Sequence, residues 1–267
     1  MPQNFHYILQ MDNCLILHRK FLIMINTHDD FNSFVIDVTE GQLEVYKSSF
    51  QKNDEFILIP EFISKGILTR MLLDSERCKE DAHRSFIPKH KKGGSVPRPI
   101  LKKKSPVLSS LYESREILYF FNQLTGQDLN LCPDHDLHAC ALYLYTEEGD
   151  HIDYHFDTSY YKGARYTALL GILNRSECLL EYELFHKLEG QDIVKDASPV
   201  EPGTLVFFNG DKVRHRVTPA GVGDERVVLT LEYVTDSEMS LVTKFVSNMK
   251  DAIAYFGFRN VFGTKDL

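Results

Sequence analysis

The chain has 267 residues, 43 % of them hydrophobic, which suits one large core or a single domain with extensions. Its formal net charge of -8 and its pI of about 5.8 argue against a general attraction to nucleic acid or to an anionic membrane. No apolar run reaches the length of a membrane span, and the five cysteines form no Cys-x-x-Cys pair. We therefore expect a cytoplasmic protein with reduced thiols and no membrane partner.

The first part of the chain predicts helices around a short strand. Residues 1–30 are expected to be an N-terminal extension of uncertain order, because the stretch CLILHRKFLIMI fits either a strand or a docked helix. The domain proper is expected over residues 31–267. Apolar spacing predicts a helix over 41–54, then a short strand ended by Pro60, then a helix over 64–82 with Ser64 at its N-cap.

Residues 83–106 have a different composition, with four prolines, two adjacent glycines and many cations. This composition predicts a long surface loop. The simpler interpretation is a solvated, mobile loop. The functional alternative is a lid over an anionic small molecule, with Arg98 as one of its contacts, whereas so short a basic cluster in an acidic chain does not favour nucleic-acid binding.

The second half of the chain predicts a β domain. A helix is expected over 109–126, with a serine near its start and Gly126 near its end. Many short apolar or alternating segments follow between about 139 and 235, separated by turn sequences such as EEGD, NRSE and GVGDE. Short strands at this spacing are typical of an all-β sandwich or barrel. A final helix is expected over 240–258.

The stretch HIDYHFD carries ionisable side chains at every second position, which on a strand would place His151, Asp153, His155 and Asp157 on one face. His155 and Asp157 would then suit one metal ion. A His-x-Asp pair alone is common by chance, but His215 follows a later apolar strand and its turn and is the candidate third ligand. Two imidazoles and one carboxylate form the facial triad of non-haem Fe(II) oxygenases.

Arg226 comes eleven residues after His215 and begins the apolar strand RVVLTLEY. An arginine that enters a buried strand is costly unless an anion pairs with it. A guanidinium binds a carboxylate through two hydrogen bonds, and a dicarboxylate co-substrate would supply one.

The pattern His155, Asp157, His215, Arg226, together with the phrase PGTLVFFNGDKVRHRVTPAGVGDERVVLTLEY, resembles the Fe(II)/2-oxoglutarate-dependent dioxygenases over about residues 55–236. The resemblance implies a mainly β fold with flanking helices, the double-stranded β-helix or jelly roll. It also implies that Fe(II), 2-oxoglutarate and O2 take part. Arg226 would pair with the far carboxylate of 2-oxoglutarate, and Thr167 would be a second contact to it, although a threonine in a strand is also an ordinary β-former.

A narrower resemblance concerns HFDTSYYKGARYTALLGIL, which is similar to iron enzymes that chlorinate or hydroxylate free amino acids, the lysine chlorinases among them. Those chlorinases have a small residue, and bind chloride, where this chain has Asp157, so hydroxylation is expected here. Asp153 would pair with a substrate ammonium group, Arg98 with a carboxylate, and His151 would line the pocket unless it lies in a solvated turn. The alternation also points Glu232 into the barrel, whereas Asn209 is first of all part of an Asn-Gly turn.

The leading hypothesis is therefore a hydroxylase of a small polar metabolite, such as a free amino acid, with no nucleic-acid partner. Two alternatives stay open at this point. One is a hydroxylase of protein or RNA that docks through the basic segment, and the other is a non-catalytic jelly-roll protein that binds a metal or 2-oxoglutarate.

Overall fold

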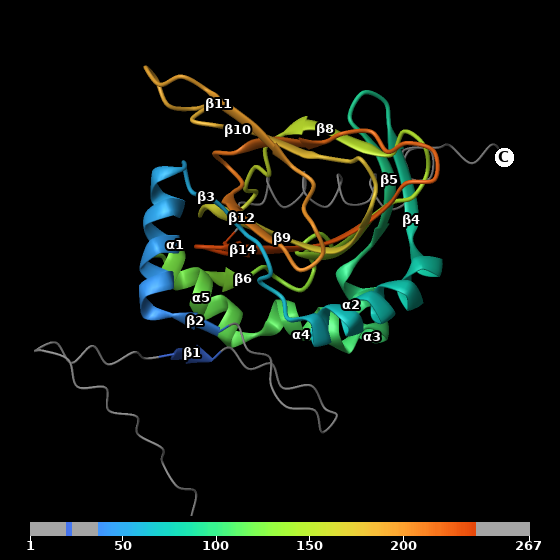
Figure 1. Ribbon diagram of the computed structural model, residues 1–267, viewed down its shortest axis with the longest axis horizontal. Coiled ribbons are helices and arrows are strands. Elements are labelled where there is room, and N and C mark those ends of the chain that lie inside the picture. Colours follow the sequence, from blue (N-terminus) through green and yellow to red (C-terminus); the bar gives the residue numbers. More distant parts are fainter. Residues whose placement is uncertain (1–19, 23–36, 239–267) are drawn as a thin grey trace, which may run out of the picture.

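The computed structural model describes residues 20–22 and 37–238, in which an antiparallel sheet of twelve strands curls strongly and helices flank it (Figure 1). The strands of this sheet are β3 (Phe56–Ile59), β4 (His83–Ile87), β5 (Lys91–Val96), β6 (Asn130–Leu131), β7 (Cys140–Tyr145), β8 (His151–His155), β9 (Arg165–Arg175), β10 (Leu180–Leu184), β11 (Val194–Ser198), β12 (Leu205–Asn209), β13 (Arg214–Val217) and β14 (Glu225–Val234). A separate pair joins β1 (Lys20–Leu22) to β2 (Asp37–Thr39). The expected mainly β fold with flanking helices is confirmed.

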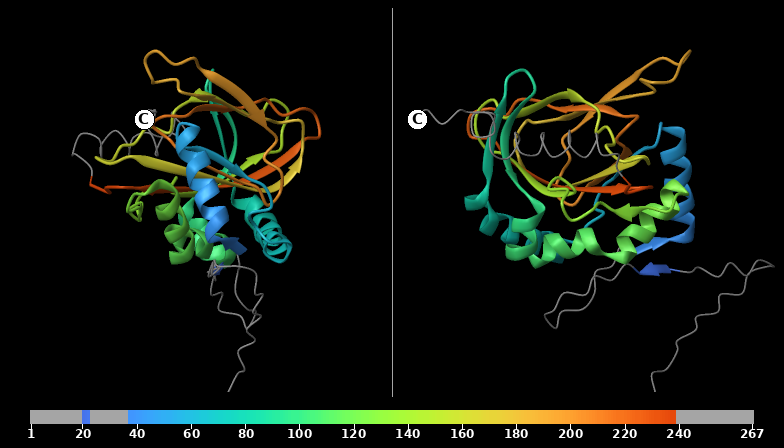
Figure 2. Two further views of the ribbon diagram at one scale, coloured as in Figure 1. Left: turned by 60° about the vertical axis from the view of Figure 1, so that its left-hand side comes forward. Right: turned by 180° about the vertical axis from the view of Figure 1, so that it is seen from behind.

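The helices lie along one side of the curled sheet, as both views in Figure 2 show. They are α1 (Glu40–Lys52), α2 (Lys65–Cys78), the short 3-10 helix η1 (Lys79–Asp81), α3 (Arg98–Lys104), α4 (Pro106–Glu113) and α5 (Arg115–Thr125). Thr39 and Gln42 form a reciprocal capping box at the start of α1. The helix expected over 109–126 is divided, because the hydroxyl of Ser114 caps a new helix by accepting from the amide of Ile117.

The order of the strands explains how the sheet closes. Along the sheet they run β11-β10-β13-β8-β5-β7-β14-β9-β12-β3. β5 pairs with β7 through its second half and with β8 through Lys91 and Lys92, so it joins the two sides of the curl. As a result β8 and β13 face β14 and β9 across an interior space.

Strict alternation along the long strands separates two cores. On β12, Leu205 and Phe207 pack toward the helices, whereas Val206 and Phe208 face the interior of the curl. On β14 the helix side takes the odd-numbered apolar residues from Val227 to Tyr233. The even-numbered residues from Arg226 to Glu232 line the interior cavity instead, which confirms the inward direction expected for Glu232.

The prediction of a long loop over 83–106 is wrong. The segment forms β4, β5 and α3, and β4 and β5 pair as a hairpin. The prolines occupy positions that regular structure tolerates: Pro97 is the N-cap of α3 and Pro99 lies in its first turn. The two glycines do not prevent a strand here: a Cβ atom at Gly94 would lie 3.5 Å from the Cβ atom of Leu144 on β7, an ordinary van der Waals contact.

Two further expectations fall on other parts of the chain. The helix expected over 240–258 lies outside the described residues, as does the N-terminal extension apart from 20–22. Within the described residues, no helix has the length and apolar character needed to cross a membrane. Cys78, Cys132, Cys140 and Cys178 are buried and unpaired, as expected for reduced thiols.

Candidate metal centre

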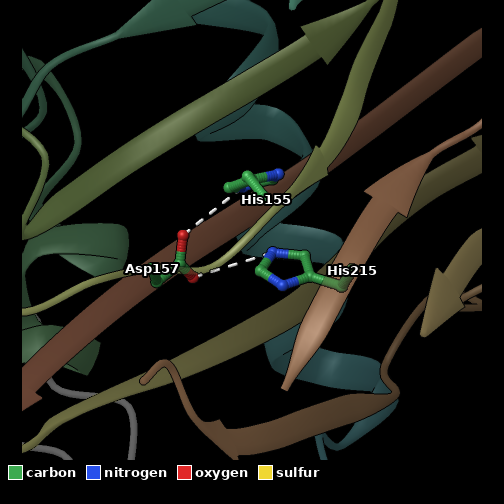
Figure 3. A group of neighbouring side chains, drawn as sticks. All are labelled: His155, Asp157 and His215. Carbon is green, nitrogen blue, oxygen red and sulfur yellow. Dashed lines mark ion pairs between the residues drawn. The ribbon is translucent and has the colours of Figure 1, made fainter. Parts of the chain in front are cut away.

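Two histidines and one aspartate converge inside the curled sheet (Figure 3). His155 ends β8, Asp157 follows two residues later, and His215 lies on β13 directly opposite His155 in the β8–β13 ladder. The His155 Nε2 atom lies 3.4 Å from Asp157 Oδ1, and the His215 Nε2 atom lies 3.7 Å from Asp157 Oδ2. The three donor atoms that could serve a metal all lie within 4.8 Å of one another.

These separations fit a shared ion. Bonds of about 2.1 Å to one metal place neighbouring donor atoms roughly 3 to 3.5 Å apart. Both histidines also have the tautomer that a metal requires. The Nδ1 atom of His155 lies 2.8 Å from the carbonyl oxygen of Asp153, and that of His215 lies 3.4 Å from the carbonyl oxygen of Val213. A carbonyl only accepts, so each Nδ1 carries a proton, and each Nε2 faces Asp157 as the atom that a metal would use.

The electrostatics of the group favour an ionised Asp157 between its two histidines. Burial opposes the charged form of His155, but Asp157 outweighs it and raises the pKa of that imidazole. Burial opposes the charged form of His215 and, with the neighbouring His155, lowers its pKa to about 4. Burial also opposes ionisation of Asp157, but His215, His155 and Arg165 outweigh it and hold the pKa of that carboxyl well below its usual range. A neutral imidazole beside a carboxylate is the state in which both bind a cation.

A bulge in β8 aims His155 at the centre. In the ladder with β13, His215 pairs with His155 and Val217 pairs with Ile152, so β8 uses three steps where β13 uses two. The extra residue lets both Ile152 and His155 face the cavity. The expectation that His151 shares the face of His155 is therefore wrong. His151 pairs with Lys92, and its Nδ1 atom lies 2.8 Å from the carbonyl oxygen of Gly149.

Asp157 is positioned by groups that come from other strands. The Thr167 hydroxyl donates to Asp157 Oδ2 at 2.8 Å. Thr167 lies opposite Glu232 on β14, six residues beyond Arg226, which is roughly 20 Å along a strand. This separation corrects the expected shared contact of Thr167 and Arg226 to one carboxylate: Thr167 orients the metal ligand instead.

Arg226 is the buried arginine that the sequence predicts. It is 1 % exposed, faces the cavity, and its Cζ atom lies 5.0 Å from the centre of the Tyr145 ring, which is directly opposite it on β7. No carboxylate of the described residues forms an ion pair with it, and its Nε atom has no hydrogen-bond partner there. Burial lowers the pKa of Arg226, and the neighbouring Tyr145 and Cys178 offset this desolvation only in part.

The other predicted contacts lie away from the cavity. Arg98 is buried, donates to the carbonyl oxygens of Cys132 and Pro133, and forms an ion pair with Asp134 at 3.0 Å. Arg98 therefore connects α3 to the segment before β7. It does not line the cavity, so the predicted role as a lid contact is wrong. Asp153 lies in the bulge, where it accepts the backbone amide of Tyr154 and does not line the cavity.

Other residues that line the cavity complete its wall. Glu232 faces the cavity as its alternation predicts, but its carboxylate forms a buried ion pair with Arg165, which the sequence did not indicate. Tyr143 and Tyr145 line the same space from β7, and the alternation of LYLYT is the feature from which their shared direction follows. Asn209 instead bonds Glu55 through its side-chain amide at 2.8 Å, consistent with its place before a turn.

Gly210 leaves the room in which Asp157 sits. A Cβ atom at Gly210 would lie 2.7 Å from both the Cβ atom and the carbonyl oxygen of Asp157, so a side chain there must displace the ligand. We expect Gly210→Ala to weaken metal binding about 10- to 100-fold, measured by anaerobic Fe(II) titration. Gly66→Ala is the matched control, because a Cβ atom at Gly66 meets nothing within 4 Å. Equal Fe(II) affinity in the two variants would contradict this placement of Asp157.

Comparisons with known proteins identify the fold. No family model matches the chain, and no curated protein matches its sequence. Solved structures do match: the non-heme alpha-ketoglutarate-dependent epimerase SnoN from nogalamycin biosynthesis has a TM-score of 0.59 at 13 % identity, covering 73 % of this chain and 81 % of that one.

Two further structures match over similar lengths. A 2OG-Fe(II) oxygenase family oxidoreductase from Burkholderia pseudomallei has a TM-score of 0.58 at 13 % identity, covering 76 % of this chain and 95 % of that one. A prolyl hydroxylase from Trichoplax adhaerens has a TM-score of 0.56 at 14 % identity, with coverages of 74 % and 93 %. The chain therefore has the double-stranded β-helix fold of the Fe(II)/2-oxoglutarate oxygenases, with His155, Asp157 and His215 converging inside it.

Proposed function

We propose that this protein is an Fe(II)/2-oxoglutarate-dependent oxygenase that hydroxylates a C–H bond of a small polar metabolite such as a free amino acid. One observation carries the proposal. A set of two imidazoles and one carboxylate shares a cavity with Arg226, a buried guanidinium for which the described residues supply no anion. That combination fits one metal ion and one dicarboxylate.

The three ligands favour an open iron site over a closed structural zinc site. Three protein ligands leave coordination positions for co-substrate and O2, whereas structural zinc sites are closed by four ligands that are mostly cysteines. With Fe(II), 2-oxoglutarate and O2 bound, such a centre oxidises an unactivated C–H bond while 2-oxoglutarate becomes succinate and CO2.

The residues of this chain have separable tasks in that reaction. The backbone carbonyls of Asp153 and Val213 fix the tautomers of the two histidines, and Thr167 fixes the carboxylate of Asp157. Arg226 and Tyr145 bind the far carboxylate of 2-oxoglutarate. Apolar side chains around them, including Leu169 and Val228, keep water from the reacting atoms.

The place of the cavity and the ligand chemistry support hydroxylation of a small molecule. The cavity lies inside the curled sheet and is lined by side chains of β7, β8, β9, β13 and β14, an arrangement that suits a small molecule better than a macromolecule. Asp157 occupies the position that the chlorinases resembling this chain leave for chloride, so we assign hydroxylation and not chlorination. The buried, unpaired cysteines suit a reducing compartment, and we place the enzyme in the cytoplasm.

The test is a screen of free amino acids for substrate-stimulated succinate release with added Fe(II) and 2-oxoglutarate. Mass spectrometry should show the gain of one oxygen, with no chlorinated product when chloride is present. Fe(II) and 2-oxoglutarate binding without any succinate would favour a non-catalytic binding protein. Oxygen incorporation only into a protein or an RNA would favour the macromolecular alternative.

A further inference from the structure

Lys91 places a second cation beside the cavity. It pairs directly with Ile152 in the β5–β8 ladder, and directly paired residues project to the same face of a sheet. Ile152 lines the cavity, so Lys91 is directed to the same side. Its Nζ atom lies 4.5 Å from the centre of the Tyr143 ring, which also lines the cavity.

The described residues give this ammonium group no counter-ion. Lys91 forms no ion pair or hydrogen bond with any carboxylate among residues 37–238, and its closest described contact is the face of Tyr143. Burial lowers the pKa of Lys91 to about 8, so it is still mostly charged at pH 7.

The neighbouring lysine shows the contrast. Lys92 pairs with His151 on the outer face, its Nζ atom donates to the carbonyl oxygen of Glu148 at 2.6 Å, and it lies 3.9 Å from Asp150 Oδ1. Lys92 is therefore satisfied by the protein, whereas Lys91 is directed into a cavity and is not.

When the charges of the proposed metal, co-substrate and cavity residues are added up, the positive charge of Lys91 has no matching negative charge. The two positive charges of Fe(II) and the one of Arg226 are matched by the single charge of Asp157 and the two of 2-oxoglutarate. Arg165 and Glu232 already neutralise each other on the far part of the wall. An additional, partly buried cation is costly unless a further anion enters with the substrate.

We infer that Lys91, supported by the face of Tyr143, binds a carboxylate of the primary substrate and thereby selects small carboxylic acids over their neutral analogues. This inference rests on the proposed function and narrows its substrate class. Lys91 is directed to the same side as Ile152, which lines the cavity together with His155, so carbons adjacent to the bound carboxylate are presented to the metal centre.

A probe that needs no knowledge of the natural substrate tests the inference. The protein is loaded with paramagnetic Mn(II) and saturating 2-oxoglutarate, and the proton relaxation of butyrate and of butyramide is measured. We expect enhanced relaxation of butyrate and not of butyramide. Lys91→Met should reduce the butyrate enhancement about 30-fold or more, as loss of one partner of a buried charge pair does, and Lys91→Arg should restore part of it.

Controls separate this inference from the proposed function. Lys92→Met is expected to behave as the unmodified protein, and His215→Ala gives the background of Mn(II) bound elsewhere. The inference would be overturned by equal relaxation enhancement for butyrate and butyramide, or by no enhancement for either. It would also be overturned if Lys91→Met lowered the affinity for 2-oxoglutarate more than the affinity for butyrate. Failure of 2-oxoglutarate to bind the Mn(II) protein in a separate titration would instead count against the proposed function.

Discussion

Replacing His215 with alanine is expected to abolish metal binding and, with it, succinate formation. The variant keeps two of three protein ligands, and losing one should cost about 100-fold or more in affinity, since even outer contacts of a ligand are worth 10- to 100-fold. His215 is 5 % exposed and its ring packs 4.8 Å from that of Phe208, so the substitution also opens a small cavity. We expect succinate release to fall below about 1 % of the unmodified rate.

Thermal unfolding distinguishes loss of the site from loss of the fold. A metal at 100 times its Kd stabilises the folded state by about 2.7 kcal/mol. For a domain of this size, that corresponds to a rise in Tm of roughly 5 to 10 °C. The unmodified protein and His135→Ala, which removes an exposed histidine, should both show this rise. A His215→Ala variant that folds but still gains the same Tm from metal would exclude His215 as a ligand.

The sequence sufficed for those parts of the site that depend on alternation within one long strand. On β14 the period of two places Arg226 and Glu232 on the inner face, and the structure confirms both. His215 lies sixty residues after His155, and its place as the third ligand came from the residue pattern of the family that the sequence resembles; the structure brings the three side chains together. Neither feature needs an exact register.

Features that depend on register were not predictable. The bulge in β8 arises from its pairing with β13, and it moves His151 to the outer face although HIDYHFD alternates without a break. Lys91 lay in a segment whose prolines and glycines indicate a loop. That segment becomes a strand because its backbone groups find partners on β7 and β8, which no local pattern shows. For the same reason Arg98 appeared mobile, whereas it is buried at the start of α3.

Replacing Arg226 with methionine is expected to weaken the binding of 2-oxoglutarate and, in the absence of 2-oxoglutarate, to stabilise the folded protein. The KM for 2-oxoglutarate should rise about 30- to 5000-fold, because removing one partner of a buried charge pair costs roughly 2 to 5 kcal/mol. Arg226→Lys should give a smaller rise, about 10-fold, since lysine keeps the charge but not the paired hydrogen bonds.

Without 2-oxoglutarate, the same Arg226→Met variant should be as stable as the unmodified protein or more stable. The guanidinium is 1 % exposed, packs over Tyr145, and has no anion among the described residues, so the folded state bears its desolvation alone. An apolar side chain of similar length removes that cost, and we expect a gain of about 1 to 3 kcal/mol in the free energy of unfolding.

Arg175→Met is the matched control for both measurements. Arg175 ends β9, its side chain is 73 % exposed, and it lies 3.7 Å from Glu225, next to Arg226 in sequence. It should alter neither the KM for 2-oxoglutarate nor the stability by more than about 0.5 kcal/mol. If Arg226→Met lowered stability and left that KM unchanged, Arg226 would be a structural residue. If removal of the buried Arg226 stabilises the protein without 2-oxoglutarate and weakens 2-oxoglutarate binding, the function of Arg226 is to bind that anion and not to stabilise the fold.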